Sequence, residues 1–226
     1  MPLATETVAE RVAALRERVD EACVAAGREP GSVAILAVTK HWPREAVLAA
    51  LDAGLRDVGE NYVQEARAKY VDLPPCTTHF IGHVQTNKAK AIVRGFDVVQ
   101  SVDRLEAGLA LARAGRELGR PARVLVQVNV SPTERFGAAP EEAQALAERL
   151  REAGLSVEGV MAIGPLAGDT ERAFTAARAT FERVGGTTLS MGMSGDWECA
   201  LKAGSTMLRL GTAIFGPRPV RERIPA

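Results

Sequence analysis

Two hydrophobic patterns alternate along this chain. Short apolar runs are each followed by a stretch in which apolar residues recur every three or four positions. The short runs predict strands, and the periodic stretches predict amphipathic helices. Eight runs predict strands, and they span Val33–Lys40, Arg56–Glu60, His79–His83, Asp97–Val102, Arg123–Val130, Ser156–Ile163, Thr188–Met191 and Met207–Gly211.

A helical pattern precedes the first predicted strand. Apolar side chains recur at spacings of three and four from Val8 to Cys23, and charged residues occupy positions on the other face. This spacing predicts a helix with one apolar face, and Gly27 then supplies a stop signal.

Later helices carry start and stop signals of their own. Pro43 suits a first helical turn, and Gly54 suits the end of the same helix. Asp103 with Glu106 resembles a capping box, and Pro140 is expected to open a further helix. These signals place a helix between consecutive predicted strands.

A strand followed by a helix, repeated eight times, predicts a closed (β/α)8 barrel of the TIM type with an extra N-terminal helix. A doubly wound sheet is disfavoured because no G-x-G-x-x-G or G-x-x-x-x-G-K-[ST] motif follows any strand. We expect one domain over residues 1–226. Residues 131–140, which follow the fifth predicted strand, are expected to form the most mobile loop.

Composition and charge narrow the function classes. Lys and Arg number 28, Asp and Glu number 28, and the formal net charge is zero, which favours a small ligand over nucleic acid or a membrane. Three cysteines without C-x-x-C spacing suggest neither disulfides nor zinc. The first residues lack a signal-peptide pattern, and no long apolar run could span a bilayer. We therefore expect a cytoplasmic protein that binds no metal.

Lys40 is the first candidate for chemistry. The chain has 23 Arg and 5 Lys, so a lysine in an unusual position needs its own reason. Lys40 closes the first predicted strand, at the mouth of the barrel and beside its apolar interior, where desolvation lowers an amine pKa and favours Schiff-base formation. The alternative is a strand-end lysine that caps carbonyls or pairs with Glu60.

Two further features point to a phosphate ligand. Ser194 follows the seventh predicted strand, and Gly211 and Thr212 close the eighth, where barrels of this type often bind phosphate through backbone N–H groups and hydroxyls. The alternative is two glycine-rich turns that only close the barrel. Arg209 lies inside the apolar eighth strand, so it contacts either a ligand or a buried ion-pair partner.

Asn61 and His83 end the second and third predicted strands, at the same mouth. Each could instead be a strand-end cap or a hydrogen-bonded histidine. Taken together, a Schiff-base lysine, a phosphate cradle and an arginine between them describe a site for pyridoxal 5′-phosphate, an aldehyde that carries a phosphate.

The sequence resembles the pyridoxal phosphate homeostasis proteins, a family whose fold is similar to the barrel domain of alanine racemase. The matching motifs are AVTK (37–40), GENYVQEA (59–66), HFIGHVQTNK (79–88), LSMGMS (189–194) and GSTMLRLGTAIFGPR (204–218). Two departures stand outside the expected cofactor contacts: Thr78 where the family usually has Trp, and ERFG (134–137) in place of a Lys-containing loop.

The resemblance implies a role for each candidate residue. Lys40 would form the Schiff base, and Ser194, Gly211 and Thr212 would hold the phosphate. Asn61 and His83 would flank the cofactor. Arg209 would face the pyridine nitrogen, where an arginine disfavours a protonated ring and weakens the cofactor as an electron sink.

The implied function is a pyridoxal 5′-phosphate carrier in vitamin B6 homeostasis. Such a protein stores the cofactor or delivers it to apo-enzymes without turnover, and we expect it to act as a monomer.

Two alternatives remain. A racemase or related pyridoxal phosphate enzyme would need a second acid or base besides Lys40. In alanine racemases this second group is a tyrosine that belongs to a separate C-terminal domain. We expect that domain to be absent, and neither Tyr62 nor Tyr70 is an evident substitute. A class I aldolase-like barrel would use Lys40 on a phosphorylated sugar.

Overall fold

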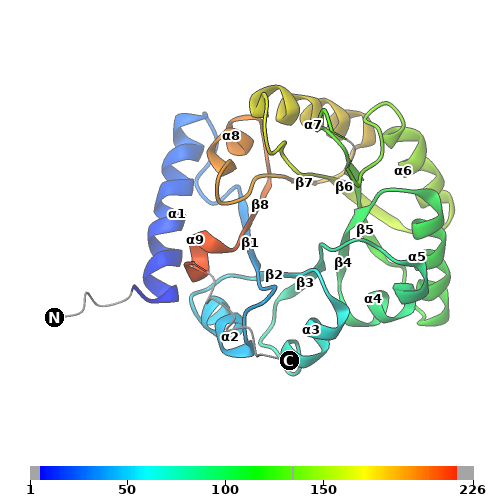
Figure 1. Ribbon diagram of the computed structural model, residues 1–226, viewed down its shortest axis with the longest axis horizontal. Helices are drawn as coiled ribbons and strands as arrows, with labels where there is room; N and C mark the ends of the chain where they lie inside the picture. Colours follow the sequence, from blue (N-terminus) through cyan, green and yellow to red (C-terminus); the bar gives the residue numbers. More distant parts are fainter. Residues whose placement is uncertain (1–5, 134, 218–226) are drawn as a thin grey trace, which may run out of the picture.

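Eight parallel strands close into a barrel at the centre of the computed structural model, which describes residues 6–133 and 135–217 (Figure 1). The strands follow one another around the barrel in chain order, and β8 pairs with β1 to close it. They are β1 (Ala34–Val38), β2 (Asp57–Glu60), β3 (Thr77–Phe80), β4 (Val98–Val102), β5 (Arg123–Val128), β6 (Ser156–Ala162), β7 (Thr188–Ser190) and β8 (Met207–Leu210). All eight predicted strands and the predicted barrel are confirmed.

Helices surround the barrel as an outer layer (Figure 1). They are α1 (Val8–Ala25), α2 (Arg44–Asp52), α3 (Val63–Lys69), α4 (Ala89–Gly95), α5 (Leu105–Glu117), α6 (Ala143–Glu152), α7 (Thr170–Val184), α8 (Trp197–Lys202) and α9 (Thr212–Phe215), with a 3-10 turn η1 (Thr86–Lys88) before α4. In the part of the chain that the structure describes, no helix has both the length and the apolar character needed to cross a bilayer.

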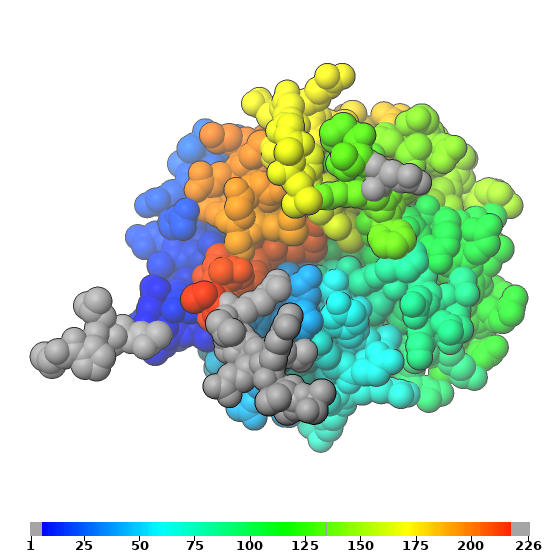
Figure 2. Space-filling view, in the orientation of Figure 1, coloured from blue at the N-terminus to red at the C-terminus, as the bar shows by residue number. Residues whose placement is uncertain are grey.

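The extra N-terminal helix is α1, and its residues explain why it forms. Thr7 and Glu10 make a reciprocal capping box at its start. Its buried face carries the predicted apolar positions, and Gly27 follows its end at φ +68°, a left-handed conformation that suits glycine. The helix packs against α2, α8 and α9, so the first and last described elements lie side by side (Figure 2, blue beside orange and red).

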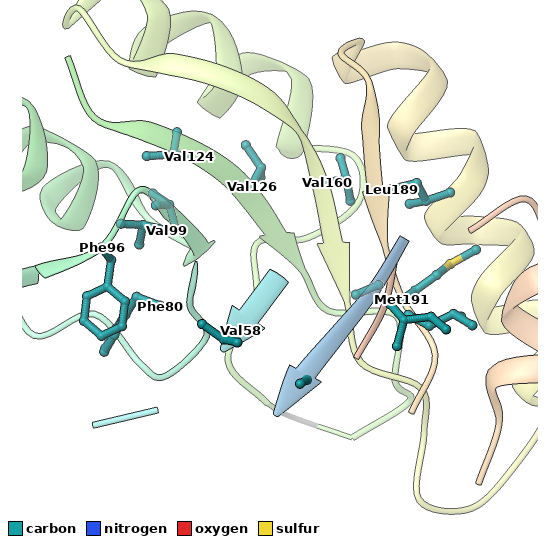
Figure 3. Close-up of a cluster of buried hydrophobic side chains, with 14 of the residues drawn as sticks. Val58, Phe80, Phe96, Val99, Val124, Val126, Val160, Leu189 and Met191 are labelled. Carbon is teal, nitrogen blue, oxygen red and sulfur yellow. The ribbon is translucent and has the colours of Figure 1, made fainter. Parts of the chain in front are cut away.

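The hydrophobic core lies between the strands and the surrounding helices. Figure 3 shows part of it, where Val126, Val160 and Leu189 from neighbouring strands form one buried cluster. Strands covered on both faces have few polar positions, which accounts for the unbroken apolar runs in the sequence. The polar residues that do lie in these strands are therefore of special interest for the site.

Three local predictions were wrong. Asp103 does not cap α5, whose N-cap is Arg104, because the Asp103 carboxylate accepts a hydrogen bond from Arg104 Nη1 at 2.7 Å. Helix α6 begins at Ala143 and not at Pro140, which lies in a turn after Ala138 has paired with β5. The third strand ends at Phe80, so His83 lies beyond it.

Candidate functional site

A cavity of about 260 Å³ opens at the carboxyl ends of β1, β7 and β8. These ends meet because β8 pairs with β1 on one side and with β7 on the other. Five of the seven predicted site residues line the cavity, together with Val38, Trp42, Met193 and Gly195; the five are Lys40, Ser194, Arg209, Gly211 and Thr212. The structure therefore brings the predicted amine, the predicted cradle and the predicted arginine to one place.

Lys40 is half-buried and lies two residues after β1. The preceding residue still continues the strand ladder, because the Thr39 N–H donates to the Gly59 carbonyl at 2.8 Å. The carboxylate that the sequence offered as an alternative partner, Glu60, is fully buried and pairs with Lys69 Nζ at 2.5 Å. The Glu60 carboxylate is thus already paired with another lysine.

The two glycine-rich turns form a set of hydrogen-bond donors beside Lys40. Ser194 Oγ accepts a hydrogen bond from the Ala213 N–H at 3.3 Å, which ties the turn after β7 to the turn after β8. The backbone N–H groups of Ser194, Gly195 and Thr212 donate to no acceptor within residues 6–133 and 135–217. Neighbouring backbone N–H groups with hydroxyls close by are what a phosphate-sized anion needs.

Arg209 is 5% exposed and is held by oxygen atoms of the barrel wall. Its Nη1 donates to the Ser190 carbonyl at 2.7 Å and to Ser190 Oγ at 2.9 Å, and its Nη2 donates to the Ala162 carbonyl at 2.8 Å. A guanidinium has five N–H donors. Those not used by the wall can serve a ligand in the cavity.

Burial lowers the pKa of Arg209 to about 10, and Asp196 partly offsets this effect. The guanidinium therefore stays positively charged at neutral pH. Among the described residues, no carboxylate lies within ion-pair distance of it, so the predicted alternative of a buried ion pair is wrong. The site thus contains a desolvated cation whose charge is available to a ligand.

A chain of polar side chains crosses the barrel interior behind Arg209. Ser190 Oγ donates to Gln100 Oε1 at 2.7 Å, and Gln100 Nε2 lies 2.9 Å from His79 Nδ1. His79 Nε2 in turn lies 2.9 Å from Asp57 Oδ1. Because an amide nitrogen only donates, His79 carries its proton on Nε2 in this arrangement. Each member of the chain has a partner, which is the condition for a stable polar group in a core.

Asn61 does not line the cavity, although the β1–β2 register places it level with Lys40 on the neighbouring strand. Its N–H donates to Glu60 Oε1 at 2.8 Å. Its side-chain oxygen is buried and has no hydrogen-bond partner among the described residues. A buried acceptor of this kind is costly unless a donor reaches it, so it favours a ligand or water nearby.

His83 also lies outside the cavity lining. Its ring stacks on Phe136 with centroids 4.0 Å apart, and its Nδ1 is 3.8 Å from Asp103 Oδ2. Phe136 belongs to the loop 131–140, which pairs with β5 through Ala138. Two residues of the quoted motifs lie outside the described residues: Glu134 of ERFG (134–137) and Arg218 of GSTMLRLGTAIFGPR (204–218).

Several residues around the site were missed by sequence reasoning. Trp42 and Met193 line the cavity, and nothing in their local pattern marks them. Lys69 is the buried partner of Glu60, and the scarcity of lysine was a usable signal for it. Gln100 and Ser190 interrupt apolar strands, as Arg209 does, so the same argument about buried polar groups could have identified them.

Fold and cavity together define a class of protein: a (β/α)8 barrel that presents a lysine and two glycine-rich turns at one mouth. The family model for the alanine racemase N-terminal domain matches residues 10–219. A pyridoxal phosphate homeostasis protein of Pseudomonas aeruginosa is 45% identical over 226 residues, covering 94% of this chain and 96% of that protein. The chain belongs to the family of pyridoxal phosphate homeostasis proteins.

Other relatives agree with this assignment. The pyridoxal phosphate homeostasis protein of Escherichia coli K12 is 36% identical, and the match covers 93% of this chain and 97% of that protein. PipY of Synechococcus elongatus PCC7942, solved with PLP bound, has a TM-score of 0.80 and 36% identity, with coverage of 93% of this chain and 100% of PipY.

Proposed function

We propose that this protein binds pyridoxal 5′-phosphate in the cytoplasm and stores it or delivers it to apo-enzymes, as part of vitamin B6 homeostasis. The observation that carries the proposal is that Lys40 and the anion cradle line one cavity of about 260 Å³. The name of the relatives, and the PLP bound to PipY, support the same ligand. In this proposal the chain acts as a monomer, and residues 1–226 form one binding unit.

The residues of the cavity suit the two ends of this ligand. The N–H groups of Ser194, Gly195 and Thr212 and the hydroxyls of Ser194 and Thr212 would hold the phosphate, and the absence of a side chain at Gly211 would let the backbone approach it. Bound pyridoxal phosphate supplies an aldehyde, which forms a reversible covalent linkage with a neutral primary amine. Lys40 would provide that amine.

Arg209 would face the ring nitrogen of the ligand. A guanidinium that is charged at neutral pH disfavours a proton on a nitrogen beside it, so the ligand would withdraw electrons less strongly. Asn61 and His83 would flank the ligand. The unpartnered Asn61 side-chain oxygen supports this role for Asn61, because a ligand or an ordered water could supply its missing donor.

Binding without turnover is the function we favour over racemisation. Racemisation needs proton donors on both faces of a substrate. Tyr70, one of the two tyrosines, is engaged with Thr39 Oγ1 at 2.8 Å, and burial raises its pKa far above the ordinary value, so it does not offer a proton. Tyr62 stands before α3 with its ring 5.9 Å from that of His41, outside the cavity lining.

The test is covalent trapping. Purified protein incubated with pyridoxal phosphate should turn yellow, and borohydride reduction should fix the phosphopyridoxyl group on Lys40, as found by peptide mass spectrometry. Lys40→Ala should abolish the trapped product yet keep weak binding through the phosphate. Lys90→Ala is the matched control, because Lys90 is exposed and pairs with Glu117 at 2.7 Å.

Two outcomes would overturn parts of the proposal. Protein that stays colourless and traps no cofactor would favour the aldolase-like alternative. Sustained conversion of L-amino acids into D-enantiomers or keto acids by the loaded protein would replace storage with catalysis. Transfer from the loaded protein to an apo-enzyme, measured with an aldehyde trap in solution, tests delivery.

A further inference from the structure

Lys69 is a buried lysine that donates to three oxygen atoms, one of which is the carbonyl of Thr39, the residue before Lys40. It is the last residue of α3, and its side chain is 7% exposed. Its Nζ donates to the Thr39 carbonyl at 2.8 Å, to Glu60 Oε2 at 2.5 Å and to Glu65 Oε2 at 2.8 Å. An ammonium has three donors, so each is used. Removing one partner of this buried cluster would leave a polar group without its hydrogen bond, which is costly.

The partners of Lys69 hold the residues on both sides of Lys40. On one side, Thr39 is bound through its carbonyl by Lys69 and through its hydroxyl by the Tyr70 hydroxyl at 2.8 Å. On the other side, the His41 N–H donates to Glu65 Oε2 at 2.8 Å. The same Glu65 oxygen therefore accepts from both Lys69 and the backbone that leaves Lys40.

The backbone at His41 needs this support. His41 has φ +67°, in the left-handed region that is unfavourable for a residue with a side chain. Such a conformation persists when surrounding contacts impose it. Glu65, anchored by Lys69, supplies one of those contacts at the residue immediately after Lys40.

Charge gives Lys69 a second effect on Lys40. Without Lys69, the carboxylates of Glu60 and Glu65 would lose the ammonium group that pairs with both of them. These carboxylates lie close to the turn that carries Lys40. They would attract the Lys40 ammonium toward the vacated place and away from the cavity. Lys69 occupies that place and satisfies both carboxylates.

We propose that Lys69 is a positioning residue for Lys40: it holds the Thr39–His41 turn and neutralises the Glu60–Glu65 pair, so that the Lys40 amine is directed into the cavity. The inference rests on the proposed role of Lys40 as the covalent ligand of pyridoxal phosphate. It assigns to α3 a part in covalent capture, although no residue of α3 lines the cavity.

The experiment compares Lys69→Met with wild type, using Lys69→Arg as the charge-conserving variant and Lys90→Met as a surface control. The first readout needs no cofactor: the rate at which acetic anhydride acetylates Lys40, followed by peptide mass spectrometry. The second is affinity for pyridoxal phosphate beside affinity for 4′-deoxypyridoxine 5′-phosphate, which has the phosphate and ring but no aldehyde.

In Lys69→Met, we expect Lys40 acetylation to slow and pyridoxal phosphate affinity to fall, each by about tenfold or more, because small displacements of a reacting group cost this much. Affinity for the aldehyde-free analogue should stay within about twofold, since the cradle residues are untouched, and Lys69→Arg should recover part of the loss. Unchanged acetylation and affinity would overturn the inference, as would equal weakening of both ligands, which indicates a structural role only.

If Lys69→Met fails to fold, Glu65→Ala decides the question by the same two readouts, because Glu65 is partly exposed and its loss releases His41. Failure of the proposed function itself would look different. Wild-type protein would then trap no pyridoxal phosphate on Lys40, while the acetylation rates of Lys40 would still report whether Lys69 positions it.

Discussion

Ser190→Ala is a sharp test of how the barrel holds Arg209. The Ser190 hydroxyl is fully buried, accepts from Arg209 Nη1 at 2.9 Å and donates to Gln100 Oε1 at 2.7 Å. Alanine removes one oxygen atom, so the cavity it leaves is small. The dominant effect is that one N–H of Arg209 and the Gln100 side-chain oxygen lose their partner inside the core.

The expected loss follows from these two groups. A buried polar group left without a partner costs about 1–3 kcal/mol. Arg209 Nη1 keeps its bond to the Ser190 carbonyl at 2.7 Å, which the substitution retains. We therefore expect the free energy of unfolding to fall by about 3 kcal/mol, taken as the sum of two mid-range penalties with some local relaxation.

Urea unfolding followed by tryptophan fluorescence measures this loss, since the chain has two tryptophans, Trp42 and Trp197. Ser156→Ala is the matched control: Ser156 is an exposed serine at the start of β6, and its backbone bond to the Ala122 carbonyl survives the change. The control should change the free energy by less than about 0.5 kcal/mol. A similarly small loss for Ser190→Ala would refute the reasoning.

A double variant separates unpaired groups from lost volume. Gln100→Leu removes the oxygen that Ser190→Ala leaves unpaired, so the double variant should lose less stability than the two single variants combined, by about 1 kcal/mol or more. Strict additivity would show that the two side chains do not act as one hydrogen-bonded unit.

Two further predictions concern Tyr70 and Gly82. Because burial raises the pKa of Tyr70 far above its value in the unfolded chain, the unfolded state loses this proton first as pH rises, and stability should fall by about 1.4 kcal/mol per unit above about pH 10. Arg209, with its pKa lowered to about 10, makes stability rise with pH in the same range. The test is therefore the difference in the free energy of unfolding between wild type and Tyr70→Phe, measured by urea unfolding as a function of pH. Parallel pH profiles of the two proteins would contradict the prediction. Gly82→Ala should lower the free energy of unfolding by about 2 kcal/mol or more, because the added Cβ would lie 2.1 Å from the Asn61 carbonyl oxygen. Gly95→Ala is the control: nothing lies within 4 Å of its added Cβ, so it should be neutral or stabilising in thermal melts. Equal effects of the two substitutions would refute this prediction.

Much of the architecture was readable from the chain. The eight apolar runs were each followed by a helical pattern, and all eight strands formed in order. The location of the candidate site followed from that order, because the carboxyl ends of parallel barrel strands share one face. Lys40 and Thr212 are 172 positions apart, yet both could be assigned to that face because each follows a strand that closes the barrel.

Boundaries and caps were less readable. Asp103 has the spacing of a helix cap, but its carboxylate is used by Arg104 instead. His83 was expected at the end of a strand and lies three residues past it, stacked on a loop from beyond β5. In both cases a local motif competes with a contact made in the folded molecule, and the local motif alone does not reveal the competitor.

By itself the sequence determined the order of the strands, the apolar faces and five of the residues that line the cavity, because hydrophobic burial depends on local periodicity. Only the tertiary structure decided which buried polar groups pair: Glu60 with Lys69, and Arg209 with Ser190 and Ala162. The reason is that hydrogen bonds are short-ranged and directional, so a partner is selected by distances of about 3 Å that exist only after the barrel has closed.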